Sequence, residues 1–484
     1  MRVLDIIKML SDVELFGDAD TEILDITEHS ASANTGAVFV CIKGSRDDGA
    51  AHLAEARLRG SSVFVCESKV NILRGETLIF SKNARKTSAE ISKILYGSCT
   101  EFMKVIGITG TKGKTTTAKL LSDCISWLRI PHLLIGTLGI DFYEKEHTSQ
   151  SSDNTTPDAP HLYRALRDAF EKGIRIAVIE VSSQALSNFR VFGIPFFAVV
   201  FTNFSPDHIG PSEHNDVDEY YQAKKSLFSD YGAEVAVVNS SDDLSMKISE
   251  GVKSVFTVSY DLSSDFCVRI GEKSKFGITF TVNGIHFELP MGGVFNALNA
   301  AVAVACASVC FDRPAETFVT PLSRSLIPGR YELYSYCKRM IVIDFAHNEE
   351  SFRSICESVK FEFGGRIIAV FGSVGERSFE RRESLARVAE ELADLSVITS
   401  DNPGFEEAEK ICDDILFYFC DKSRAVVIVD REEAIKSALA YSHEGDCILL
   451  LGKGHEEFQD IKGQRIPFSE RKIIEDLGAR KLIR

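Results

Sequence analysis

The chain has 484 residues, of which 44% are hydrophobic and 26% are charged, as in ordinary soluble globular proteins. At about 150 residues per domain, this length predicts roughly three domains, each able to bury its own core. The formal net charge of −15, from 55 basic and 70 acidic residues, argues against a nucleic-acid-binding protein, because such a protein needs a basic face.

The first 98 residues predict a small α/β domain, residues 1–98. Asp5 and Lys8 interrupt the first apolar run and no small-residue cleavage site follows, so we expect no signal peptide. Residues 53–59 look helical and lie between two short apolar runs.

A central domain is predicted over residues 99–327. It opens with a buried strand at Lys104–Thr109, a glycine turn and a helix over Thr115–Trp127. Strands and helices then alternate, which predicts a mostly parallel sheet with crossover helices. Within residues 254–290 the pattern changes to short alternating segments, and Asn283-Gly284 signals a type I′ turn in an antiparallel patch.

A Rossmann-like domain is predicted over residues 328–484. It follows an Ala-rich helical stretch at residues 294–310 and the break at Pro328-Gly329, and its alternation of strands and helices indicates a doubly wound sheet. The strands predicted from apolar runs are, in chain order, Val38–Ile42, Ser62–Cys66, Lys104–Thr109, His132–Ile135, Ile174–Val181, Phe196–Asn203, Val235–Asn239, Phe266–Ile270, Ile278–Val282, Met340–Phe345, Arg366–Phe371, Leu395–Ser400, Ala425–Val429 and Cys447–Leu451.

The cysteines and the apolar runs predict a cytoplasmic protein. The 12 cysteines are scattered without a CxxC pair, which indicates buried free thiols in a reducing compartment. Cys306 and Cys310 could be two metal ligands on a helix, but no His or Cys partner lies at zinc spacing, so a helix core is favoured. We identify no run of about 18 apolar residues and expect no membrane span.

A phosphate-binding loop is predicted after the strand at Lys104. Glycines let backbone N–H groups point into one concavity, and the helix N-terminus and Lys114 add positive charge. Thr115 is placed to ligate Mg²⁺. The general pattern would have glycine at position 108, where this chain has Ile108. The residues assigned to the loop are Gly110, Thr111, Lys112, Gly113, Lys114, Thr115 and Thr116.

Two further segments place metal-ligating groups beside this loop. Glu180 ends the apolar strand at Ile174–Val181, and the carboxyl ends of parallel strands meet at one sheet edge. A lone glutamate there is usually solvated, but its link to a phosphate loop favours a metal ligand. Asp207-His208 follows the strand ending at Asn203 and offers a third group at that edge.

Several segments together resemble the Mur ligases, and among them the ligases that add the third peptide residue. Taken singly, some of these segments are weak matches, but their order along nearly the whole chain is specific. They are Thr109–Thr116, Asn154–Pro157, Glu180–Leu186, Thr202–His208, Ala223–Phe228, Phe295–Asn299, Gly329-Arg330, Asp344–His347 and Gly452–Glu456.

The resemblance implies an ATP-dependent ligase of three α/β domains that joins a free amino acid, expected to be a diamino acid, to UDP-MurNAc-L-Ala-D-Glu. The reaction would pass through an acyl phosphate in peptidoglycan precursor synthesis. Lys114 would hold ATP phosphates, with Thr115 and Glu180 serving one Mg²⁺. His208 and a carbamate on Lys224 would serve a second Mg²⁺, because carbamylation creates the anionic oxygen that a hard metal prefers. From the sequence pattern alone, Lys224 is expected to be a solvated lysine on a helix.

The same resemblance assigns the remaining site residues. Arg330 and Asp344 would contact the nucleotide ribose, His347 the phosphates, and Asn296 and Asn299 the adenine side. We expect a monomer. The residues implied to contact the muramoyl substrate or the incoming amino acid are Ser30, Thr155, Thr156, Ser182, Arg190, Asp401, Asn402, Gly452 and Glu456.

Four segments depart from the family pattern. The uridine-side motif Asp-Ser-Arg is replaced by His29-Ser30-Ala31, and Gln184 replaces a histidine. Pro206 and the stretch Ile209–His214 also differ. Gly404 stands where diaminopimelate-adding members have an arginine that binds the carboxylate of the substrate side chain, which argues against diaminopimelate. Glu456 remains as an amine-binding acid, which would suit lysine or ornithine.

Two alternatives stay open at this point. A paralogue with the same chemistry could act on a different acid, as the folylpolyglutamate synthetase relatives do, although the Asn154–Pro157 loop counts against it. A non-catalytic binding protein is the second alternative. The intact residues that speak against it are Lys114, Thr115, Glu180, His208, Lys224 and His347.

Overall fold

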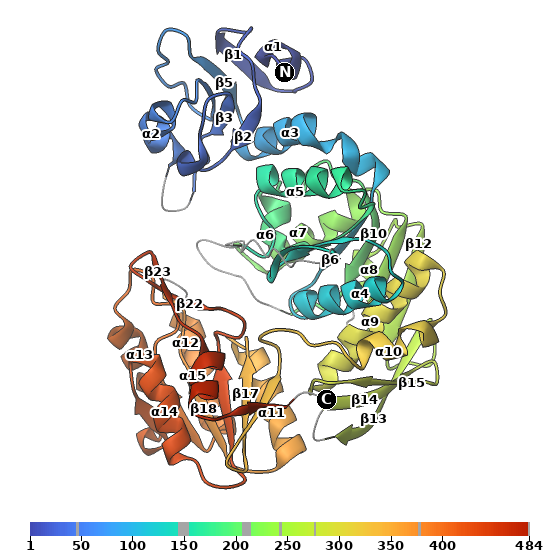
Figure 1. The fold of residues 1–484 in the computed structure, drawn as a ribbon, viewed down its shortest axis with the longest axis vertical. Helices are drawn as coiled ribbons and strands as arrows, with labels where there is room; N and C mark the ends of the chain where they lie inside the picture. Colours follow the sequence, from blue (N-terminus) through green and yellow to red (C-terminus); the bar gives the residue numbers. More distant parts are fainter. Residues whose placement is uncertain are drawn as a thin grey trace. The chain divides into compact units, whose positions relative to one another are not determined.

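The computed structural model describes residues 1–44, 48–143, 154–205, 214–241, 244–274, 277–375 and 379–482. Its contacts divide the chain into two compact units. Unit 1 comprises Met1–Phe266 and Val302–Arg313, and unit 2 comprises Cys267–Ala301 and Pro314–Arg484. Both units are α/β, as the alternation of apolar runs and helical segments predicts (Figure 1).

The N-terminal sheet of unit 1 has the strand order β1-β5-β4-β3-β2. Strands β2 to β5 are parallel neighbours, and β1 runs antiparallel to β5. β3 and β4 are buried at every position, as expected for strands covered on both faces. The strands are β1 (Val13–Gly17), β2 (Asp25–Thr27), β3 (Ala37–Val40), β4 (Val63–Cys66) and β5 (Thr77–Ser81), with helices α1 (Val3–Ile7), α2 (Leu53–Leu58) and α3 (Ala84–Tyr96).

The seven strands of the central sheet that lie in unit 1 follow the order β12-β11-β10-β6-β9-β7-β8. All neighbours are parallel except β8, which pairs antiparallel with β7. β6 therefore lies between β9 and β10, and the loops after these three strands meet at one edge. The strands are β6 (Lys104–Thr109), β7 (Leu133–Gly136), β8 (Gly139–Phe142), β9 (Ile176–Glu180), β10 (Phe196–Phe201), β11 (Val235–Asn239) and β12 (Ser254–Ser259).

The helices of unit 1 follow from capping and amphipathic spacing. α5 (Ala159–Glu171) begins after Asp158, whose side chain accepts from the His161 N–H, and it packs against α3 (Figure 1). α4 (Lys114–Trp127) contacts β6, β7 and β9. The remaining helices are α6 (Ser183–Ser187), α7 (Val217–Ser229) and α8 (Ser245–Ile248).

An antiparallel meander, β13 (Phe266–Ser274), β14 (Gly277–Val282) and β15 (Ile285–Leu289), opens unit 2. Asn283 and Gly284 have φ values of 50° and 84°, so both turn positions are left-handed, as the predicted type I′ turn requires.

Helix α9 (Val294–Phe311) corrects the expectation that no membrane-length apolar stretch exists. By length and composition it could cross a membrane, with a mean hydropathy of 1.9, and 67% of it is buried within the structure. The stretch does not count as a continuous apolar run because Asn296, Asn299 and Ser308 interrupt it, although none of these residues carries a charge. A buried core helix has the same composition, and Cys306 and Cys310 lie in its buried part with their sulfurs 3.8 Å apart.

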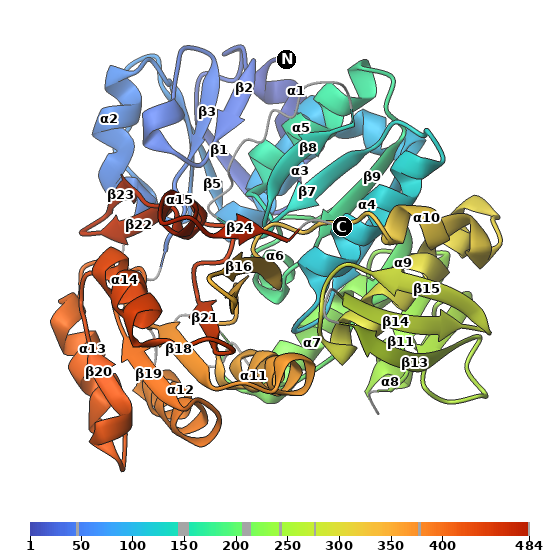
Figure 2. The same cartoon turned by 60° about the horizontal axis from the view of Figure 1, so that its bottom comes forward.

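The C-terminal sheet of unit 2 has the strand order β20-β19-β18-β21-β17-β16-β24. β17, β21, β18, β19 and β20 are parallel, as in the predicted doubly wound domain. Helices α11 (Glu349–Phe363), α12 (Phe379–Leu392) and α13 (Ala408–Phe417) pack on one another along the sheet, and α14 (Arg431–Tyr441) packs with α15 (Glu470–Asp476) (Figure 2). The strands are β16 (Glu332–Tyr336), β17 (Arg339–Asp344), β18 (Ile367–Phe371), β19 (Leu395–Ile398), β20 (Ala425–Val427), β21 (Cys447–Leu451) and β24 (Arg480–Lys481).

Helices and one hairpin complete unit 2. The helices are α10 (Val319–Leu322), α11 (Glu349–Phe363), α12 (Phe379–Leu392), α13 (Ala408–Phe417), α14 (Arg431–Tyr441) and α15 (Glu470–Asp476). The hairpin is β22 (Phe458–Ile461) with β23 (Gln464–Pro467).

A buried ion pair ties α14, α15 and two strand ends together. The Arg431 guanidinium donates to Glu470 Oε1 at 2.8 Å, to Ser400 O at 3.1 Å and to Leu451 O at 2.7 Å. Both side chains are at most 1% exposed. Ser400 lies just after β19, and Leu451 is the last residue of β21. The Arg431–Glu470 ion pair therefore holds the starts of the two loops that follow these strands.

Replacing Arg431 with methionine is expected to destabilise the protein by about 3 kcal/mol, because it leaves the Glu470 carboxylate buried without its cation. Denaturant unfolding followed by circular dichroism measures this loss. Arg387→Met is the matched control, since Arg387 forms an exposed pair with Glu383 and its loss should change stability little. Equal stability of the two variants would contradict the importance of the buried pair.

Candidate active site

The predicted phosphate loop lies between the end of β6 and the start of α4. Thr111 N–H donates to Asn203 O at 3.0 Å and Lys112 N–H to Asn203 Oδ1 at 2.9 Å, so the loop is tied to the end of β10. Lys114 Nζ donates to Gly110 O at 2.8 Å and to Thr111 O at 3.0 Å. The lysine therefore sits inside the loop at the N-terminus of α4, where an anion is favoured.

Glu180 is the polar centre of this edge. Its carboxylate accepts from Thr115 Oγ1 at 2.8 Å and from the Thr137 N–H at 2.9 Å and Thr137 Oγ1 at 3.2 Å. Glu180 is 2% exposed. The structure thus brings together Thr115 and Glu180, as the metal-site prediction expected. Thr137 was missed, although it follows β7 at the same carboxyl edge.

The hydrogen bonds continue from Glu180 into the segment predicted to contact the acid substrate. The hydroxyl oxygens of Thr137 and Thr155 lie 3.2 Å apart, within hydrogen-bond distance, and Thr156 Oγ1 donates to Glu180 O at 2.7 Å. Arg190 Nη1 reaches Thr156 O at 2.8 Å, and the Ser182 N–H donates to Thr156 Oγ1 at 3.1 Å. Thr155 and Thr156 are therefore linked to Thr137 and Glu180 beside the phosphate loop, and Ser182 and Arg190 are linked to Thr156.

Two glycines allow this close packing. A Cβ on Gly110 would lie 2.0 Å from Thr202 Oγ1, and the residue has φ +146°. A Cβ on Gly136 would lie 2.0 Å from Glu180 Oε1. Both contacts are far shorter than any real Cβ contact, so both positions require glycine.

Lys224 is buried, which contradicts the interpretation of a solvated helix lysine. Its Nζ donates to Gly110 O at 2.9 Å and lies 4.3 Å from the ring centroid of Tyr220. Tyr220 OH donates to Thr111 Oγ1 at 3.1 Å. The buried face of α7 comprises Tyr220, Lys224, Leu227 and Phe228, at helical spacing, so Lys224 belongs to the stripe that faces the phosphate loop.

Some predicted site residues lie outside this cluster. Asp207 and His208 fall outside the described residues, as do Pro206 and most of the stretch at residues 209–214. Its last residue, His214, places Nε2 2.9 Å from Ser183 Oγ. Ser30 lies on the N-terminal part of unit 1, where its Oγ donates to Glu55 Oε2 at 2.7 Å.

Unit 2 carries the residues predicted for the nucleoside. Asp344 ends β17 and accepts from the Tyr331 and Ala346 N–H groups, both at 2.8 Å. Burial raises the pKa of Asp344, and nearby Arg330 opposes this rise. The Arg330 guanidinium lies 4.8 Å from the ring centroid of Phe345. In the same unit, Asn299 Nδ2 donates to Asn296 Oδ1 at 3.3 Å.

A second polar cluster in unit 2 joins the residues predicted to bind the incoming amino acid. Lys453 Nζ donates to Asn402 Oδ1 at 2.7 Å and to Glu456 Oε2 at 2.6 Å, and Asn402 Nδ2 donates to Glu456 Oε2 at 2.9 Å. Gly452 is packed against Asp401, whose buried Oδ2 would lie 2.5 Å from a Cβ there. Lys453 was missed, although it lies within the segment used for the resemblance.

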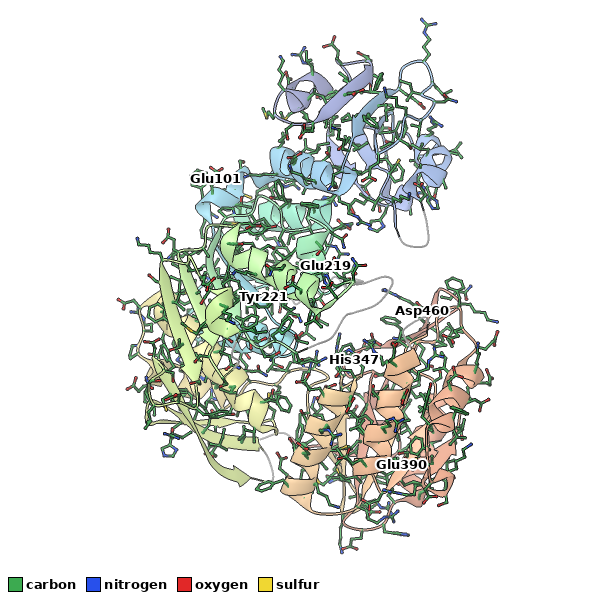
Figure 3. All side chains as sticks on the ribbon, turned by 180° about the vertical axis from the view of Figure 1, so that it is seen from behind. Glu101, Glu219, Tyr221, His347, Glu390 and Asp460 are labelled. Carbon is green, nitrogen blue, oxygen red and sulfur yellow. The ribbon has the colours of Figure 1, made fainter. Side chains whose placement is uncertain are left out.

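This cluster lies at the carboxyl ends of the parallel strands of unit 2. His347 follows β17, and Asp460 lies on the hairpin β22–β23, where its N–H donates to Asn402 Oδ1 at 3.0 Å. In Figure 3, His347 and Asp460 lie toward the upper end of unit 2, and Glu390 lies toward its lower end. Gly404 has a φ of +59°. Its N–H donates to Asp460 O at 3.1 Å, and its carbonyl oxygen accepts from the Lys462 N–H at 2.7 Å.

Comparison with known proteins agrees with this geometry. The Mur ligase middle domain matches residues 108–307, and the Mur ligase, glutamate ligase domain matches residues 329–454. The UDP-N-acetylmuramoyl-L-alanyl-D-glutamate–2,6-diaminopimelate ligase of Aquifex aeolicus is 34% identical over 460 residues, covering 93% of each chain. A solved structure of a ligase with that name has a TM-score of 0.65 and 25% identity, covering 98% of both chains.

A folylpolyglutamate synthase of Mycobacterium tuberculosis also has this fold, with a TM-score of 0.62 and 18% identity. It covers 75% of this chain, compared with 98% for the diaminopimelate ligase structure. The chain belongs to the Mur ligase family. Within the family, the relatives from Aquifex aeolicus, Clostridium perfringens and Clostridioides difficile, which are 31–34% identical to this chain, are of the MurE type, as the motifs predict.

Proposed function

We propose that this chain is an ATP-dependent ligase that adds the third amino acid, a diamino acid, to UDP-MurNAc-L-Ala-D-Glu in peptidoglycan precursor synthesis. The observation that carries the proposal is the hydrogen-bond chain from Thr115 through Glu180 and Thr137 to Thr155 and Thr156. This chain joins the proposed ATP loop to the proposed acid-substrate segment through one residue, Glu180, whose carboxylate contacts Thr115 and Thr137 and whose main-chain carbonyl accepts from Thr156. The name of the Aquifex aeolicus relative, which states this reaction with diaminopimelate, supports the assignment.

The chemistry follows from what an acid and an amine need in order to condense. A carboxylate oxygen of the acid substrate attacks the γ-phosphorus of ATP, and ADP leaves, giving an acyl phosphate. The amine nitrogen then attacks the acyl carbon, inorganic phosphate leaves, and the amine proton passes to solvent. Lys114 and the N-terminus of α4 neutralise the charge on the transferring phosphoryl group.

Apart from the His208 nitrogen, the metal ligands proposed are oxygen atoms, which suit Mg²⁺. Thr115 and Glu180 would hold one ion, which neutralises phosphate charge when bound. A second ion would be held by His208 and a carbamate on Lys224. Lys224 is buried beside the loop carbonyl of Gly110. From this position a carbamate oxygen would face the phosphate edge, by which we mean the edge of the central sheet that carries the phosphate loop, Thr137 and Glu180.

The remaining assignments extend the proposal to both units. Arg330 and Asp344 would contact the ribose, His347 the phosphates, and Asn296 and Asn299 the adenine side. Ser30 and Arg190 would contact the nucleotide-linked acid. We place the functional domains at residues 1–98, 99–327 and 328–484 and the protein, as a monomer, in the cytoplasm. The amino acid would contact Asp401, Asn402, Gly452 and Glu456, and Lys453 Nζ holds two of these side chains, Asn402 and Glu456, in place.

The selected amino acid is expected to be lysine or ornithine rather than diaminopimelate. Gly404 has no side chain with which to bind the second carboxylate of diaminopimelate. A panel assay tests this: purified protein, ATP, Mg²⁺, UDP-MurNAc-L-Ala-D-Glu and each diamino acid, with phosphate release and product mass as readouts. Turnover fastest with diaminopimelate would refute the selectivity, and no turnover with any diamino acid would refute the function.

A paralogue acting on a different acid is the second candidate, favoured by the replacement of the uridine-side motif with His29-Ser30-Ala31. Calorimetric titration with UDP-MurNAc-L-Ala-D-Glu separates the two candidates. Saturable binding supports the muramoyl substrate. Absence of binding, in a protein that still binds ATP, favours the paralogue.

A further inference from the structure

One cluster of metal-ligating side chains lies outside the phosphate edge. His29 precedes the short helix Ser30–Ser32, and Asp158 and His161 lie at the start of α5. Each side chain offers one ligand atom, and these atoms all lie within 4.8 Å of one another. We propose that His29, Asp158 and His161 form a binding site for a divalent transition-metal ion of the zinc class.

The distances between the donor atoms suit a single ion. His29 Nε2 lies 3.1 Å from Asp158 Oδ2, and His161 Nδ1 lies 2.8 Å from the same oxygen. Ligands about 2.0–2.1 Å from a tetrahedral zinc ion are about 3.3 Å apart, so each histidine–carboxylate distance needs to change by only a few tenths of an ångström. The two imidazole nitrogens lie within 4.8 Å of each other, and the exposed rings turn to bring them to the same spacing. Two imidazoles and one carboxylate also form the protein ligand set of open zinc sites, with the fourth position left for another ligand.

A second carboxylate, Glu28, lies close to Asp158 in this cluster. Burial alone would raise the pKa of Asp158, but hydrogen bonds from His161 and His29 hold it well below its usual range. Burial and the neighbouring Asp158 raise the pKa of Glu28, so two carboxylates repel each other here. Arg85 and Arg190 offset part of this repulsion, and a bound divalent ion would offset more.

The solvent can reach the cluster. The side chains of His29 and His161 are 56% and 41% exposed, whereas Asp158 is 16% exposed. The carboxylate is thus held by the helix start, and the two imidazoles can reorient around an incoming ion. Asp158 also caps α5 through the His161 N–H at 3.0 Å, which fixes the carboxylate before any ion binds.

The position of the site beside the segments proposed to bind the nucleotide-linked acid gives the ion a role in substrate binding. This role rests on the proposed function. His29 directly precedes Ser30, and Asp158 follows Thr155 and Thr156 by two or three residues. Ala31 stands where the family has a cationic arginine, so this chain has lost a positive charge beside the nucleotide-linked substrate. A zinc-class ion would restore that charge, and its open position would accept an anionic phosphate or carboxylate oxygen of the substrate.

Cobalt titration of the full-length, tag-free protein tests the site without any nucleotide. Co²⁺ is added in the presence of excess Mg²⁺, which occupies the oxygen-ligand sites, and the visible d–d absorption is recorded. We expect one equivalent to bind without a thiolate charge-transfer band. His29→Ala and His161→Ala should each lose at least about 100-fold in affinity. His443→Ala, which removes an exposed histidine from unit 2, should match the wild type.

Binding of less than one equivalent, or equal affinity in the His29, His161 and His443 variants, would overturn the proposal and leave a hydrogen-bonded His–Asp–His cluster. Circular dichroism checks that each variant is folded, and a zinc-induced rise in melting temperature, absent in the two site variants, gives a second readout. Failure of the ligase assay would not affect either result. Calorimetry with UDP-MurNAc-L-Ala-D-Glu, with and without Zn²⁺, then tests the substrate step, and equal affinities would refute that step alone.

Discussion

Replacing Lys114 with alanine is expected to lower kcat by about 10³-fold, the cost of losing a preorganised charge that acts on the transition state. Lys114 Nζ is held by the carbonyls of Gly110 and Thr111 at 2.8 and 3.0 Å, so its position is set before substrate binds. Because charge spreads over the phosphoryl oxygens during transfer, kcat should fall more than KM rises.

Steady-state phosphate release with the amino acid found by the panel measures this effect. Lys119→Ala is the matched control, since Lys119 lies on the same helix and pairs with Asp123. The control should keep wild-type activity. A Lys114→Ala enzyme with wild-type kcat would show that the loop does not act on the transferring phosphate.

Replacing Glu180 with glutamine is expected to lower kcat by about 10²-fold and to raise the Mg²⁺ concentration needed for half-maximal rate. Glutamine keeps the size of the side chain but removes its charge. It also turns one acceptor into an N–H donor, which faces the Thr137 N–H or the Thr115 hydroxyl and costs about 1–3 kcal/mol of stability.

Magnesium titrations of the rate, with thermal unfolding in parallel, separate the loss of charge from the loss of stability. Glu171→Gln is the control, because Glu171 ends α5 and its carboxylate is exposed beside Arg167. An unchanged magnesium requirement in Glu180→Gln would exclude this carboxylate as a metal ligand.

Local sequence patterns were sufficient to predict the phosphate edge. The buried runs of β6, β9 and β10 and the glycine turn before α4 are local features, and parallel pairing brings their carboxyl ends together. Thr137 could have been found by the same rule, since it directly follows β7. A polar residue at a strand end is common, however, and only the hydrogen bonds to Glu180 distinguish this one.

Burial and long-range contacts were harder to predict. Lys224 reads as a surface residue by its charge, and its burial becomes visible only when Tyr220 and Leu227 are seen to share its helix face. The approach of His29 to Asp158 joins residues 129 positions apart. No local periodicity encodes such a contact, because it depends on how α5 packs beside the N-terminal sheet.

The close approaches at Gly110 and Gly136 have a consequence for how the gene can vary. The space that a methyl group would need is filled by Thr202 at one position and by Glu180 at the other. In a deep mutational scan under selection for growth, these two codons should tolerate fewer substitutions than many residues with functional groups. The geometry of the site thus depends on two positions that must stay glycine, as well as on the side chains that carry the chemistry.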